Sequence, residues 1–164
     1  TALGSGHPFM IRYPRGHGEG LPWRGEKFET LPVGRGRRLR EGADVALLTV
    51  GTVGNAAARA AGRAAAEGVS VAHYDLRFVK PLDEALLDEV GRKFRRVVTV
   101  EDGSLRGGVG EAVAAFFNAR GLDVSVRSLG IGDEWVEHGT PGQLYALCGY
   151  DEEGILRALL DTRA

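Results

Sequence analysis

Two arginines near the start of the chain have surroundings that suit the binding of an anion. Arg12 and Arg15 flank a Tyr-Pro pair that follows a short apolar segment, residues 8–11. Proline fixes the backbone just before Arg15, and a guanidinium on a rigid element can bind a phosphate or a carboxylate through two parallel hydrogen bonds. The alternative is a pair of surface arginines at a domain junction, and physical reasoning alone leaves the two interpretations even.

Two adjacent carboxylates follow an apolar run that reads as a central strand. Glu101 ends the run at 96–101 and Asp102 follows it, and ligands of open α/β sheets bind at the carboxyl ends of the strands. These side chains are therefore candidates for acid–base chemistry or for hydrogen bonds to a ligand. No histidine or thiol lies beside them, however, and carboxylates at such positions often cap the helix that follows.

The glycine-rich turn at 103–110 has part of the spacing of a phosphate-binding loop. It lies between an expected strand and an expected helix, as such a loop does. A phosphate loop also needs a lysine followed by a hydroxyl residue, where this chain has Val109 and Gly110. The turn at 51–54 likewise lacks the glycine order of a dinucleotide site, so we interpret both turns as structural.

The histidines and the cysteine form no pattern of metal ligands. Four histidines are scattered along the chain, and Cys148 is the only cysteine, which excludes an internal disulfide framework and a multi-thiolate zinc site. His73 falls within an apolar run, so we expect a hydrogen-bonded core residue. One cysteine agrees with a reducing compartment, and we expect a cytoplasmic protein.

From residue 43 onward, apolar runs of strand length alternate with segments of helical periodicity, which is typical of βαβ units. In an extended strand, successive residues of the run at 45–50 would point to opposite faces of the sheet, and both sets are apolar. This predicts a central strand that is covered on both sides. Thr52 is expected to cap the first helix, and residues 140–143 have a capping-box layout. We expect strands at 45–50, 69–74, 96–101 and 123–129, an edge strand within 31–39, and helices starting near 53, 83, 110, 141 and 152. The predicted fold is an α/β domain with an open, mostly parallel sheet of about five strands and helices on both faces.

The head of the chain differs in composition from the rest. Residues 1–40 carry eight Lys or Arg against three acidic residues, and 14–42 are rich in Gly, Pro and charge, as in a linker. The chain begins at Thr1 and leads directly into an apolar segment, from which we expect a fragment of a larger protein. No apolar run approaches the length of a membrane span, and no signal-peptide pattern is present, so we expect neither a membrane nor a nucleic-acid partner.

Six segments, in order along nearly the whole chain, resemble the 1-deoxy-D-xylulose-5-phosphate synthase family. The segment at 75–83 is the most specific to this family. The turn with acidic residues and glycines, at 98–103 and 107–110, is shared more widely among transketolase-like enzymes. The segments are IRYPRG at 11–16, LPVGRG at 31–36, DLRFVKPLD at 75–83, VTVEDG at 98–103, GGVG at 107–110 and EHGT at 137–140.

The resemblance implies that 1–16 end a pyrimidine-binding domain, that 17–42 form a linker and a first edge strand, and that 43–164 form a transketolase-type carboxy-terminal domain. The family joins a two-carbon unit from pyruvate, with loss of carbon dioxide, to glyceraldehyde 3-phosphate, for isoprenoid and thiamine precursors. Thiamine diphosphate and Mg²⁺ are implied for the full-length enzyme, not for this segment, as is a homodimer. By its place in the motif, Arg15 resembles the arginine that binds the acceptor's phosphate, and Arg12 belongs to the same strand.

No catalytic residue of the family falls within these residues, so the chain alone is expected to be inactive. Two other interpretations stay open at this point. One is the carboxy-terminal domain of another transketolase-like enzyme, such as an E1β subunit of a 2-oxoacid dehydrogenase, which would serve as a structural interaction domain. The other is a free-standing α/β module that binds a nucleotide at the carboxyl edge of its sheet.

Overall fold

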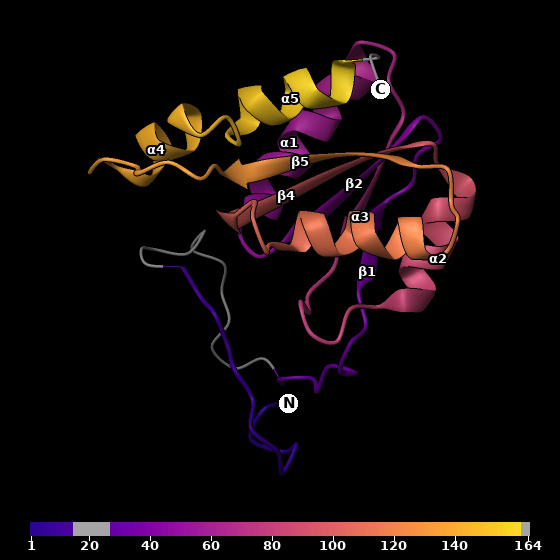
Figure 1. Cartoon of the computed structure of the whole chain (residues 1–164), viewed down its shortest axis with the longest axis vertical. Coiled ribbons are helices and arrows are strands. Elements are labelled where there is room, and N and C mark those ends of the chain that lie inside the picture. Colours follow the sequence, from indigo (N-terminus) through magenta and orange to yellow (C-terminus); the bar gives the residue numbers. More distant parts are fainter. Residues whose placement is uncertain (15–26, 162–164) are drawn as a thin grey trace.

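The chain forms a five-stranded sheet between two layers of helices (Figure 1). A computed structural model describes residues 1–14 and 27–161. The strand order is β1-β3-β2-β4-β5; β2 to β5 run parallel, and β1 pairs antiparallel with β3. This confirms the predicted fold class. The strands are β1 Arg37–Arg40, β2 Val45–Val50, β3 Val71–Asp75, β4 Arg96–Ser104 and β5 Ser125–Ile131.

Helices cover both faces of the sheet, as the doubly apolar run at 45–50 predicts. Val45 and Leu47 of β2 pack in one buried cluster with α1 and α5, whereas Ala46 and Leu48 pack in the other with α2 and α3. Figure 1 shows the two pairs of helices on opposite sides of the sheet. The helices are α1 Val53–Ala66, α2 Glu84–Lys93, α3 Val109–Ala119, α4 Pro141–Leu147 and α5 Glu152–Leu160.

Four alanines on one face of α1 are fully buried, which allows this helix to lie close to the sheet. On the side turned toward α5, Arg59 and Arg63 form ion pairs with Glu152 and Glu153. These pairs lie at the surface and contribute little stability individually. The buried alanine face is therefore what fixes the position of α1 over the sheet.

Apart from shifts of up to three residues at the ends of β3, β4 and β5, the structure differs from the sequence-based expectations at three places. β1 covers only 37–40, because Gly34 adopts a left-handed conformation (φ 73°) and Arg35 N donates to Pro32 O, so the chain turns before the strand starts. Thr52 occupies the N-cap position of α1 without a side-chain cap, since backbone carbonyls accept from the first N–H groups, Gly51 O from Gly54 N among them. Residues 8–14 form no strand in the described part of the chain.

Candidate functional site at the carboxyl edge of the sheet

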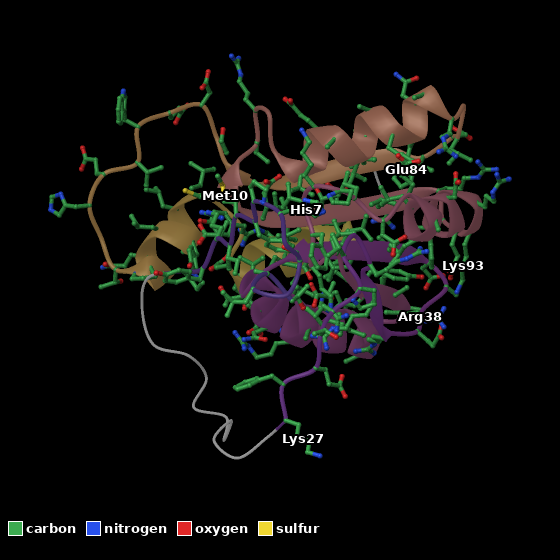
Figure 2. The ribbon with its side chains drawn as sticks, turned by 90° about the horizontal axis from the view of Figure 1, so that it is seen from below. His7, Met10, Lys27, Arg38, Glu84 and Lys93 are labelled. Atoms are coloured by element: carbon green, nitrogen blue, oxygen red, sulfur yellow. The ribbon has the colours of Figure 1, made fainter. Side chains whose placement is uncertain are left out.

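The parallel strands end at one edge of the sheet, and the described amino-terminal segment, residues 1–14, lies beside that edge. The ring of Phe9 contacts the ring of Phe78, just beyond β3, edge to face with centroids 6.4 Å apart. The charge of Arg12 acts on Tyr145 of α4 and lowers its pKa, against the stronger effect of burial, which raises it. His7 and Met10 mark this segment in Figure 2. The segment thus reaches both the turn after β3 and the region beyond β4.

The turn after β3 holds an arginine in an unusual backbone conformation. Arg77 has φ 56°, and among the described residues it is the one non-glycine residue in the left-handed region. This conformation costs an L-residue with a Cβ about 1–2 kcal/mol, so the surroundings must impose it. The amide of Leu76, which is buried, donates to Thr49 O at 2.9 Å and ties the turn to β2.

Asp75, the last residue of β3, contacts this turn through both carboxylate oxygens. Its Oδ1 accepts a hydrogen bond from the backbone N–H of Arg77 at 3.1 Å. Its Oδ2 lies 3.1 Å from Nε of Arg37, on β1, and 3.9 Å from Nε of Arg77. The side chains of Asp75 and Arg77 are 19% and 23% exposed, so the pair is partly shielded from water.

Glu101 is buried and uses both carboxylate oxygens at the start of α3. Its Oε2 accepts from Val109 N at 3.0 Å and its Oε1 from Gly110 N at 2.9 Å. A negative charge is favourable there because the first N–H groups of a helix have no partner within the helix. A Cβ at Gly108 would lie within 2.7 and 2.8 Å of the same oxygens, so only glycine fits. The N–H groups that a bound phosphate would use are thus occupied by the protein's own carboxylate.

Asp102 is half-buried and accepts hydrogen bonds from two tyrosines. The hydroxyl of Tyr150 donates to Oδ1 at 2.9 Å, and that of Tyr145 donates to Oδ2 at 3.4 Å. Burial is the main cause that raises the pKa of Tyr150, and the hydrogen bond to Asp102 adds to it. Because Arg12 influences Tyr145, the structure brings two of the predicted residues, Arg12 and Asp102, to the same end of the molecule.

His73 lies in the core beneath this edge, as its apolar surroundings predict. It is 1% exposed, and its Nε2 forms a hydrogen bond with Thr49 Oγ1 at 2.9 Å. Thr49 Oγ1 also lies 3.3 Å from Tyr74 O, to which the hydroxyl can donate. Burial lowers the pKa of His73 to about 4, so the ring is neutral near pH 7.

Of the two arginines predicted to bind an anion, only Arg12 lies among the residues that the structure describes. Arg12 is exposed, and Arg15 lies outside the described residues. Arg77 was not a candidate from the sequence, because a left-handed arginine has no signature of its own. The one available signal was Asp75, since an aspartate commonly accepts a hydrogen bond from the backbone two residues later.

Within residues 1–14 and 27–161, no group of three or more His, Cys, Asp or Glu could hold a metal ion. The described residues thus show no such group for the Mg²⁺ that the resemblance implies for the full-length enzyme. In the same residues, no helix combines the length and the apolar character that crossing a bilayer requires.

The sheet and its two helical layers define an α/β domain with a mostly parallel sheet, which carries an arginine and carboxylates at its carboxyl edge. Its described polar residues at this edge fix turns and present charge, whereas the hydroxyl–imidazole pair of Thr49 and His73 is buried in the core. The chain belongs to the transketolase carboxy-terminal domain family, whose model matches residues 34–155.

The curated relatives that this chain matches are much longer than the chain itself. It is 53% identical over 157 residues to 1-deoxy-D-xylulose-5-phosphate synthase of Bacteroides fragilis, covering 95% of this chain and 24% of the relative. The enzyme of the same name from Symbiobacterium thermophilum is 43% identical over 155 residues, covering 94% and 24%. The chain thus spans about a quarter of the length of these relatives.

A solved structure has the same fold. It is described as a split gene transketolase, an inactive β4 tetramer, and superposes with a TM-score of 0.76 at 32% identity. The superposition covers 85% of this chain and 46% of that one. The likeness agrees with the five-stranded, mostly parallel sheet.

Proposed function

We propose that this chain is the carboxy-terminal part of a 1-deoxy-D-xylulose-5-phosphate synthase. The observation that carries the proposal is the 53% identity to such an enzyme across nearly the whole chain. The full-length protein would be a cytoplasmic homodimeric transferase that joins pyruvate, with decarboxylation, to glyceraldehyde 3-phosphate, for isoprenoid and thiamine precursors. Thiamine diphosphate, held with Mg²⁺ by the rest of the enzyme, would supply the electron sink that decarboxylation of pyruvate requires.

The part assigned to this chain is to bind the acceptor's phosphate and to brace the other domains. Arg15 is the first candidate, because a proline fixes the backbone before it. Arg12 belongs to the same segment. Arg77 is a further candidate, because strained backbone is found preferentially at functional sites and its turn lies at the ligand-binding edge of an open sheet. The chain contributes no proton-transfer group to the reaction and is inactive alone.

Nothing observed favours the nucleotide-binding module. The N–H groups at the start of α3 already donate to Glu101, and no lysine stands at the position that a phosphate loop needs. The E1β alternative is less well supported than the synthase, because the high-identity curated relatives described above are synthases along their matched length.

The test uses the full-length enzyme from the same gene, assayed with pyruvate and glyceraldehyde 3-phosphate. We expect Arg15→Ala and Arg77→Ala each to raise the KM for the phosphorylated acceptor at least about tenfold, the loss of one charge-assisted pair. The KM for pyruvate is expected to stay within about twofold. Arg95→Ala is the matched control, because Arg95 is an exposed, ion-paired arginine at the opposite, amino edge of the sheet. A full-length enzyme without synthase activity would refute the proposal.

A further inference from the structure

The turn after β3 contains a carboxylate whose contacts go beyond an ordinary ion pair. Asp75 accepts the backbone N–H of Arg77 with one oxygen and lies near Nε of the same arginine with the other. One side chain therefore acts on both the backbone conformation and the charged group of Arg77. Its second partner, Arg37, anchors the carboxylate to β1.

The backbone contact bears on where the guanidinium points. At φ 56° the side chain of Arg77 leaves the chain in a direction that an extended or helical residue would not give it. Without an acceptor for its N–H, the residue would lose the contact that offsets this strain and would relax to a negative φ. The Asp75 Oδ1 bond thus selects the conformation that sets the direction of the side chain.

The side-chain contact bears on which part of the guanidinium meets a ligand. Asp75 approaches Arg77 at Nε, the nitrogen nearest the backbone. A guanidinium has a further binding edge formed by its two terminal nitrogens, which suits a phosphate. A carboxylate beside Nε restrains the guanidinium on the side nearest the backbone, and the edge formed by the two terminal nitrogens faces away from that carboxylate.

We infer that Asp75 is a positioning residue, which holds Arg77 in its left-handed turn so that the terminal edge of the guanidinium meets the phosphate of a sugar phosphate. This inference rests on the proposed function, because it takes Arg77 as a ligand of the acceptor. Asp75 itself does not touch the ligand. It acts through the backbone and the charge of its neighbour, with Arg37 as its anchor.

The first test compares acceptors in the full-length enzyme. We expect Asp75→Ala to raise the KM for glyceraldehyde 3-phosphate about tenfold, since small misplacements of a binding group are costly. The KM for pyruvate and the kcat/KM for unphosphorylated glyceraldehyde are expected to stay within about twofold. Asp75→Asn keeps an oxygen for the N–H of Arg77 but lacks the charge, so a smaller rise of about threefold is expected.

The matched control is Asp44→Asn. Asp44 also accepts a backbone N–H, that of Ser70 at 2.7 Å, but it lies at the amino edge of the sheet before β2. Its replacement is expected to leave both acceptors unaffected. If Asp75→Ala weakens both acceptors and pyruvate equally, Asp75 is merely structural and the inference is wrong.

The outcomes separate the inference from the proposed function. An effect of Arg77→Ala on the phosphorylated acceptor without any effect of Asp75→Ala would overturn the role of Asp75 alone. No effect of Arg77→Ala would overturn the assignment of Arg77 to the acceptor, and the positioning role with it.

A second measurement, on the 164-residue chain, needs no activity. Glycine adopts φ 56° without strain, so Asp75→Ala is expected to lower the Tm less in an Arg77→Gly background than in the original chain. Equal losses in the two backgrounds would show that Asp75 does not maintain the turn, and would contradict the inference.

Discussion

Two strands of the sheet, β3 and β4, lie on either side of β2 and carry carboxylates near their carboxyl ends that have different functions. Near the carboxyl end of β4, the oxygens of Glu101 accept the first N–H groups of α3, which starts at Val109. Beyond the end of β3, α2 begins only at Glu84, and its N-terminus is capped by Asp83 rather than by Asp75. There Asp75 instead holds an arginine in a strained turn. The comparison teaches that a carboxylate near the carboxyl end of a strand can cap the helix that follows, as Glu101 does, or can order a turn that carries an arginine, as Asp75 does.

The largest effect is expected from removing the carboxylate that caps α3. Glu101→Ala leaves two buried N–H groups without an acceptor, and each bond to a charged group contributes about 1.5–3 kcal/mol. We expect the free energy of unfolding of the 164-residue chain to fall by about 4 kcal/mol, measured by urea denaturation. Glu111→Ala is the control, because exposed Glu111 also accepts a backbone N–H, that of Gly107. Similar losses in the two variants would contradict the structural role of Glu101.

The next effect concerns β3 and depends on pH. The pKa of His73 is about 4 in the folded chain against about 6.5 unfolded. Below pH 6.5 the unfolded chain therefore takes up a proton that the folded chain does not, so stability falls from pH 6.5 to 4 and this contribution levels off below pH 4. The loss amounts to about 3 kcal/mol over that window.

His73→Gln is expected to remove most of this pH dependence, measured by urea unfolding at a series of pH values from 7 to 4. His138→Gln is the control, since His138 is exposed. An unchanged slope in His73→Gln would show that other groups govern the acid sensitivity of the β3 side of the sheet.

The smallest expected effect concerns the two tyrosines that donate hydrogen bonds to Asp102 on β4. Tyr150→Phe removes the 2.9 Å hydrogen bond to Asp102 and is expected to cost about 1.5 kcal/mol in the free energy of unfolding. Tyr145→Phe removes the longer, 3.4 Å contact and is expected to cost less. The reverse order in thermal denaturation would mean that Tyr145, the tyrosine influenced by Arg12, is the main partner of Asp102.

Local sequence patterns predicted the framework of this domain well. The run at 45–50 became the central strand β2, and Thr140 and Gln143 form the capping box that their spacing predicts. These features depend on residues close together in the chain. The division of the head into 1–16 and 17–42 remains a prediction.

The site was less predictable, because its features depend on contacts between distant elements. The sequence left Glu101 open between a ligand-binding role and a helix cap, and the distance from β4 to the start of α3 decides how its oxygens are used. In the left-handed turn, the N–H of Arg77 donates to Asp75, and the N–H of Leu76 donates to Thr49 on another strand. No propensity of arginine indicates this conformation.

The strand β1 has a consequence for how copies of this chain behave in concentrated solution. An exposed strand at the border of a sheet invites another chain to add to it. Three of the four residues of β1 are arginines, all four are exposed, and its register with β3 shifts between Arg38 and Arg40. Like charges and an interrupted ladder oppose such growth, so we expect this border to protect the chain against aggregation into fibrils.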